Sequence, residues 1–172
     1  NKGLIHIIEP GLEEIVRTTV KNGSLRAQTI PSQADIYLIA VPTPFHSCSN
    51  NLPEPNIDYV LEATKSIIPF LQDNTLVILE STSPVGTTEK INNLITENVK
   101  PDQAGIHVAY CPERVLPGKI LDELIFNDRV IGGITPTANQ KAQNFYKSFC
   151  KGTFLCTTSK TAELVKLAEN AY

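Results

Sequence analysis

Short apolar runs alternate with amphipathic segments along the chain. Residues 11–22 predict a helix, because apolar side chains recur every three or four positions and Gly23 follows its end. Strands are expected at 25–29, 36–41, 75–79, 106–110, 128–133 and 154–157, and further helices at 57–70, from about 88, from 135, and at 159–172. This alternation favours an α/β domain with a parallel sheet.

Polar, turn-forming segments follow three of the predicted strands. The run at 36–41 is apolar on both faces, which is typical of a central parallel strand, and it ends at Pro42-Thr43-Pro44 because proline cannot donate to a sheet. Glu80–Thr87, rich in Ser and Thr, follows the next strand, and Pro112-Glu113-Arg114 follows the third. Ligands of open α/β sheets bind beyond the carboxyl ends of strands, so the sequence predicts a ligand site there.

Each of these segments has a purely structural alternative. The turn at Thr43 either presents its hydroxyl to a ligand or simply ends a strand. Glu80–Thr87 places hydroxyls at a helix N-terminus, which suits an anion or polar cofactor, but the same threonines also suit helix capping. Glu113 would serve as an acid or base and Arg114 would fork onto a carboxylate or phosphate; alternatively, they form an ordinary surface pair.

The last predicted helix carries a second pair of polar residues. Lys166 and Asn170 are four positions apart and share one helix face. Both would converge on one substrate oxygen, where the lysine would stabilise developing negative charge. The alternative is a solvated helix face, and Glu163 and Glu169 are predicted to be such surface charges.

Composition narrows the classes of partner and site. The net charge of -3 and the scattered cations argue against a nucleic-acid partner. No apolar run approaches the roughly 20 residues that span a bilayer, and the start of the chain has no signal pattern, so a cytoplasmic protein without a membrane partner is expected. The four cysteines and three histidines lack metal-ligand spacing, which predicts free thiols and no metal site.

Five motifs, taken in order, resemble those of the UDP-glucose/UDP-mannosamine dehydrogenase family: VPTPF, ESTSPVGTTEK, YCPERVLPGK, NDRVIGG and KLAENAY. The resemblance covers essentially the whole chain. The ERVLPG form is similar to the UDP-N-acetylmannosamine branch, because the UDP-glucose branch usually carries a second Glu at the position of Pro117. The family likeness implies a Rossmann-like parallel sheet lacking its first βαβ unit over residues 1–157. Residues 158–172 would begin the long helix that leads to a central dimerisation and substrate domain.

The resemblance also implies a reaction and roles for cofactor residues. Family members oxidise the primary alcohol of a nucleotide sugar to a carboxylate with two NAD+, through a thioester on a cysteine. Thr43, Ser81 and Thr82 would bind NAD. Thr82 and Glu113 would position the water that hydrolyses the thioester.

The implied substrate residues lie later in the chain. Arg114 and Val115 would line the site for the UDP-sugar. Lys166 would act as the acid/base or oxyanion-stabilising residue, with Asn170 as its hydrogen-bonding partner. The full enzyme is expected to be a cytoplasmic homodimer that serves polysaccharide synthesis.

Two elements of the family pattern are absent from these residues. There is no G-x-G-x-x-G turn for NAD and no Gly-Gly-His-Cys-type segment with the catalytic cysteine, and Cys111 is not expected to replace it. This stretch by itself is therefore expected to be inactive. Three alternatives remain open: another UDP-hexose (UDP-glucose or UDP-N-acetylglucosamine) as substrate, a β-hydroxyacid dehydrogenase with a similar Lys-x-x-x-Asn helix, and an inactive remnant of the same fold.

Overall fold

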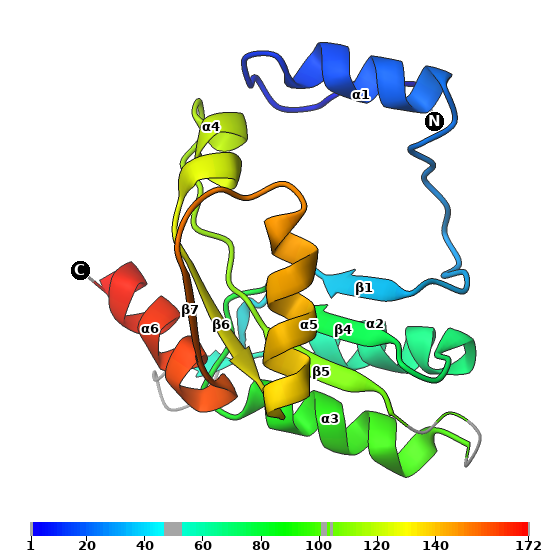
Figure 1. The fold of residues 1–172 in the computed structure, drawn as a ribbon, viewed down its shortest axis with the longest axis vertical. Helices are drawn as coiled ribbons and strands as arrows, with labels where there is room; N and C mark the ends of the chain where they lie inside the picture. The colour runs from blue at the N-terminus through cyan, green and yellow to red at the C-terminus, as the bar shows by residue number, and fades with distance from the viewer. Residues whose placement is uncertain (1, 47–52, 101–102, 104, 172) are drawn as a thin grey trace.

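The computed structural model describes residues 2–46, 53–100, 103 and 105–171. Within them the main sheet has five strands, shown in Figure 1, in the order β1 (Ile36–Ile39), β4 (Leu76–Leu79), β5 (His107–Tyr110), β6 (Arg129–Gly133) and β7 (Phe154–Thr158). Strands β2 (Phe45–His46) and β3 (Glu54–Pro55) form a separate antiparallel pair. The predicted α/β class is confirmed.

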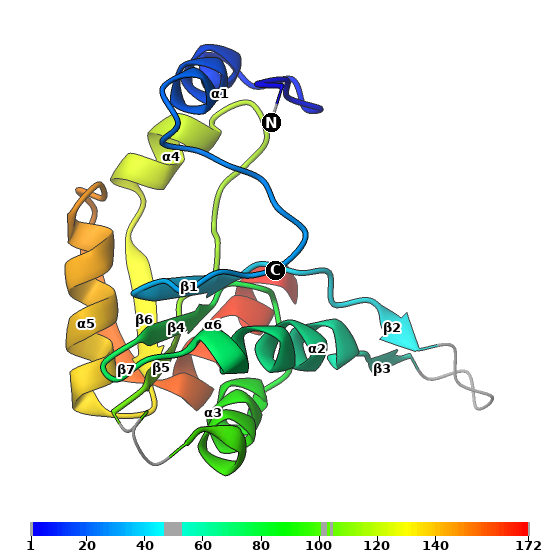
Figure 2. The same cartoon turned by 90° about the vertical axis from the view of Figure 1, so that its right-hand side faces the viewer.

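Helices cover both faces of this sheet (Figures 1 and 2). One face carries α2 (Asp58–Ile67) with its 3-10 turn η1 (Ile68–Phe70), α3 (Thr87–Asn98) and α6 (Ser159–Ala171), and the other carries α5 (Pro136–Lys147). Successive side chains of β4 point to opposite faces, so Val77 and Leu79 join the first layer whereas Leu76 and Ile78 join the second. All four are buried, which makes β4 the centre of the core.

The sheet is mostly parallel, with one reversal that the sequence did not predict. Strands β1, β4 and β5 run parallel, β6 pairs antiparallel with β5, and β7 runs parallel to β6. The start of β6 therefore lies at the same edge as the carboxyl ends of β1, β4 and β5. Helix α6 follows β7 from the opposite edge and runs back along the sheet, which carries its second half toward the predicted ligand site (Figure 1).

Helix α6 starts in direct contact with the backbone of β6. A Cβ atom at Gly132 would lie 2.5 Å from the Thr158 carbonyl oxygen and 2.7 Å from the Ala162 Cβ. Both distances are too short for any side chain, so glycine is required where α6 crosses the sheet. Ala162 is fully buried in this contact.

The N-terminal segment lies apart from the sheet, next to α4 (Ile120–Phe126), and includes α1 (Leu12–Lys21) (Figure 2). The strand predicted at 25–29 is not formed, because the residues that the structure describes place no neighbouring strand beside it. For the same reason β1 is an edge strand here, and Leu38 on it is 45% exposed. Among the described residues, no helix is long and apolar enough to cross a membrane.

Candidate active site

Hydrogen bonds join the loops that follow β1 and β4. The Val41 amide donates to Ser81 Oγ at 2.8 Å, and Ser81 Oγ donates to the Val41 carbonyl at 2.7 Å. Thr43 Oγ1 donates to the Thr82 carbonyl at 2.6 Å. The structure thus brings together the three residues predicted to bind the cofactor, because their strands are parallel neighbours.

The three hydroxyl groups differ in what they can offer a ligand. Ser81 is buried and its hydroxyl is engaged by backbone groups, so it holds the two loops together. Thr43 has donated its only hydroxyl hydrogen and keeps only the ability to accept. Thr82 Oγ1 has no hydrogen-bond partner within the described part of the chain and is half-buried, so it is free to donate to a ligand.

A buried carboxylate fills the N-terminus of α3. Glu163 accepts the Gly86 amide at 2.6 Å, the Thr88 amide at 2.7 Å and the Thr88 hydroxyl at 2.6 Å. Negative charge is favourable at this end of a helix, where the first amides lack helical partners. The predicted surface position of Glu163 is wrong: the side chain is fully buried and caps α3 in place of Thr87.

The loop after β5 is tied to two other elements. Arg114 Nη2 forms an ion pair with Glu169 of α6 at 2.6 Å, and Arg114 Nη1 donates to the Asp128 carbonyl at 3.0 Å. Glu113 Oε1 accepts the Arg114 amide at 2.7 Å. Glu169 lies at the surface, as predicted, but its carboxylate is paired, and 33% of its side chain is exposed.

An open pocket of about 600 Å³ separates this loop from α6. It is lined by Arg114, Val115, Leu116, Lys166, Ala168 and Glu169. The structure therefore places the two predicted substrate residues and the predicted catalytic lysine around one space. Asn170 is exposed one helical turn after Lys166, and no hydrogen bond joins these two side chains in the part of the chain that the structure describes.

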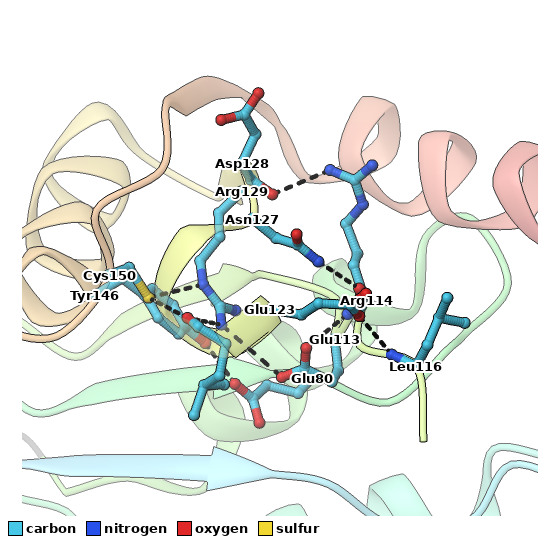
Figure 3. Close-up of polar contacts among 11 residues, drawn as sticks. Glu80, Glu113, Arg114, Leu116, Glu123, Asn127, Asp128, Arg129, Tyr146 and Cys150 are labelled. Carbon is cyan, nitrogen blue, oxygen red and sulfur yellow. Dashed lines mark hydrogen bonds and ion pairs between the residues drawn. The ribbon is translucent and has the colours of Figure 1, made fainter. Parts of the chain in front are cut away.

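A polar cluster that the sequence did not reveal lies behind this loop (Figure 3). The guanidinium of Arg129 stacks on the Tyr146 ring at 4.6 Å, donates to Cys150 Sγ at 3.0 Å and lies 3.9 Å from the Glu113 carboxylate. The Tyr146 hydroxyl donates to Glu80 Oε1 at 2.6 Å. A fixed cation thus lies behind Glu113, the residue predicted to orient water.

Burial shifts the proton affinity of two members of this region. Desolvation raises the pKa of the Glu80 carboxyl above its ordinary value, and the hydrogen bond from Tyr146 opposes the shift. Burial raises the pKa of the Cys111 thiol to about 12, although Arg129 opposes it. Because a thiolate is the nucleophilic form, this raised pKa disfavours Cys111 as a covalent nucleophile.

The chain was compared with known proteins. The family model "UDP-glucose/GDP-mannose dehydrogenase family, NAD binding domain" matches residues 1–150. The chain belongs to this family. Over its whole length it is 50% identical to UDP-N-acetyl-D-mannosamine dehydrogenase of Escherichia coli K12 and 46% identical to NDP-N-acetyl-D-galactosaminuronic acid dehydrogenase of Ralstonia nicotianae. It spans only 42% of either relative.

Solved structures agree with this assignment. The UDP-N-acetyl-mannosamine dehydrogenase of Staphylococcus aureus superposes with a TM-score of 0.87 at 37% identity, over 99% of this chain and 41% of that one. The Rossmann-type architecture of the nucleotide-sugar dehydrogenases is thereby confirmed for these residues.

The residues present fit part of an NAD molecule. The Thr82 hydroxyl and the acceptor side of the Thr43 hydroxyl suit a polar group such as a ribose. A pyrophosphate would need free helix amides, but Glu163 already binds the Gly86 and Thr88 amides at the start of α3. No cluster of His, Cys, Asp or Glu within the described residues has the arrangement of a metal site, and the three described cysteines are free; Cys48 and Tyr172 lie outside them.

Proposed function

We propose that this chain is part of an NAD-dependent UDP-N-acetylmannosamine 6-dehydrogenase, which oxidises UDP-N-acetylmannosamine to its uronic acid. The observation that carries the proposal is the pocket in which Lys166 and the Arg114-Val115 loop face one another. Membership of the dehydrogenase family supports an NAD-dependent oxidation in this pocket. The name of the relative with 50% identity supports UDP-N-acetylmannosamine as the substrate.

Lys166 is the proposed catalytic residue of the pocket. NAD+ supplies the oxidising power by accepting hydride, twice for each sugar. An ammonium group at the pocket wall would stabilise negative charge on the substrate oxygen, or hold and return its proton. Asn170, on the same face of α6, would hydrogen-bond the same oxygen or the lysine itself.

Thr82 and Glu113 are proposed to orient the hydrolytic water. Thr82 has a free hydroxyl, and Glu113 keeps one carboxylate oxygen that faces Arg129 across 3.9 Å. The proposed role of Thr43 and Ser81 is to hold NAD, Thr43 directly and Ser81 by fixing the loops.

The identity of the sugar is tested by comparing nucleotide sugars as substrates. The relative with 46% identity is named for N-acetyl-D-galactosaminuronic acid, so the galactosamine sugar belongs among those compared. The decisive measurement is NADH formation by the native polypeptide that contains these residues, with UDP-N-acetylmannosamine, UDP-N-acetylgalactosamine, UDP-N-acetylglucosamine and UDP-glucose. We expect preference for the first, two NADH per sugar and an acid product.

Two variants on the same helix test the site. Lys166→Ala should abolish turnover, whereas Lys160→Ala should retain it, because Lys160 is exposed and pairs with Glu89 at 3.0 Å away from the pocket. One NADH per substrate would contradict the reaction. Equal activity of the two variants would contradict the site.

Several wider features are proposed on the family likeness. Residues 1–157 would belong to the NAD-binding domain, and 158–172 would begin the helix that leads to the dimerisation and substrate domain. The active form would be a cytoplasmic homodimer in polysaccharide synthesis. Residues 1–172 alone would be inactive, because they lack a Gly-rich phosphate loop and the family's catalytic cysteine segment.

A further inference from the structure

One ion pair bridges the two walls of the pocket. Arg114 comes from the loop after β5, and Glu169 comes from α6, three positions beyond Lys166. Their charged atoms lie 2.6 Å apart, and each side chain is 33% exposed. The pair therefore sits at the mouth of the pocket, where solvent screens it only in part.

The side chain and backbone of Arg114 are fixed from several directions (Figure 3). In addition to Glu169, the guanidinium donates to the Asp128 carbonyl at 3.0 Å. The Arg114 carbonyl accepts Asn127 Nδ2 at 2.9 Å, and its amide donates to Glu113. Each terminal nitrogen has thus committed one of its two N–H groups inside the protein, and these contacts hold the guanidinium away from free rotation toward an anion of the substrate.

Helix α6 depends on this pair at its far end. Its fully buried residues all lie in its first two turns: Ser159, Ala162 and Glu163. Ala168 to Ala171 are exposed. Val165 packs against the core, and within the described part of the chain the bond from Glu169 to Arg114 ties the second half of the helix, which includes Lys166, to the loop that carries Glu113.

We propose that Arg114 and Glu169 form a clamp that positions Lys166 relative to Glu113, and that the Arg114 side chain is not a ligand of the substrate. The backbone of the loop is left to face the sugar. The inference rests on the proposed function for its kinetic consequences. Arg114 and Glu169 are positioning residues, because they act through Lys166 and Glu113.

Direct binding of the substrate by the Arg114 guanidinium would predict a different effect of changing Glu169. If the Arg114 guanidinium bound the substrate, Glu169 would compete for it, and its loss would leave binding unchanged or improved. If the pair is a clamp, neutralising either partner releases the same contact. The two single variants would then have the same defect, and the double variant would add nothing.

The test uses the native polypeptide with Arg114→Met, Glu169→Gln and the double variant. Glu89→Gln serves as the matched control, because it breaks another ion pair of α6, at Lys160, outside the pocket. We expect both single variants to lower kcat by about tenfold to a hundredfold, since small misplacements of catalytic groups have effects of this size. KM for the UDP-sugar should stay within about threefold of wild type, and the double variant should match the worse single one.

Amide hydrogen exchange gives a readout that does not need activity. Residues 166–171 should exchange faster in both single variants and at the wild-type rate in the control. An increase in KM confined to Arg114→Met, additive losses in the double variant, or unchanged exchange would each overturn the clamp. If wild-type protein formed no NADH, the proposed function would fail while the exchange measurement still decided the clamp.

Discussion

Replacing Glu163 by glutamine should weaken the junction between α3 and α6. The glutamine is nearly isosteric, so the change removes charge and one acceptor without leaving a cavity. Its remaining oxygen can keep the Thr88 contacts, but its amino group then faces the Gly86 amide, donor against donor. The substitution therefore isolates the electrostatic part of this buried cap.

The expected magnitude follows from these contacts. One charge-assisted hydrogen bond contributes about 1.5 to 3 kcal/mol, and the charge at a helix N-terminus contributes about 0.5 to 2 kcal/mol more when buried. We therefore expect a loss of about 3 kcal/mol in the free energy of opening of the first turn of α3. Since 1.36 kcal/mol corresponds to a factor of ten, amide exchange there should accelerate by roughly a hundredfold.

Hydrogen exchange of the native polypeptide, followed at residues 86–91, measures this directly. Glu62→Gln is the control, because Glu62 is 70% exposed and its carboxylate pairs with Lys65 on its own helix. The control should leave exchange in α3 unchanged. If Glu163→Gln accelerated exchange by less than about threefold, the assignment of Glu163 as the principal cap of α3 would be wrong.

Three further outcomes are expected. Folding raises the pKa of Glu80, so this carboxyl stabilises the protein below its ordinary pKa of 4.5, and the stabilisation is lost as the pH rises through the raised pKa. The melting temperature of the wild-type protein should therefore fall as the pH rises above 4.5, and Glu80→Gln should make this fall smaller. Alkylation of the native protein near pH 8 should modify exposed Cys156 and spare buried Cys111, as peptide mass spectrometry would show. Gly132→Ala should destabilise the protein by about 2 to 3 kcal/mol in denaturant unfolding, because its Cβ would clash with backbone.

The strand and helix pattern was predictable because hydrophobic periodicity is a local property. Predicted strands formed at β1, β4, β5, β6 and β7, with ends that differ by at most two residues. The direction of a strand depends on its partners in the sheet, so the antiparallel pairing of β6 was not predicted. Helix α4 at Ile120–Phe126 was also not predicted, because its seven residues are too few to show a clear helical period. The strand at 25–29 failed for want of a partner to complete its hydrogen bonds.

The sequence predicted which polar loops lie together in the candidate site, because these loops follow the ends of neighbouring strands. The proximity of Thr43 to Thr82 followed from parallel neighbours, but the burial of Glu163 did not, because its partners lie 75 and 77 positions away. A signal was nevertheless present. Ser159, Ala162 and Glu163 share the i, i+3, i+4 spacing of a buried helix stripe, so a carboxylate there required a buried partner.

Two buried carboxylates, Glu163 and Glu9, also decide which helix amides a ligand could reach. Helix amides that would suit a phosphate are taken internally: those of α3 by Glu163, and those of Gly118 and Ile120 at α4 by Glu9. At the start of α2, the Asp58 amide is also bound internally, by the side-chain amide oxygen Asn56 Oδ1 at 2.7 Å. The amides of Gly86, Thr88, Gly118, Ile120 and Asp58 are therefore not available to the pyrophosphate of a dinucleotide. These internal caps therefore order the starts of α2, α3 and α4 without a ligand, and the amides that they bind cannot hold a phosphate at the same time.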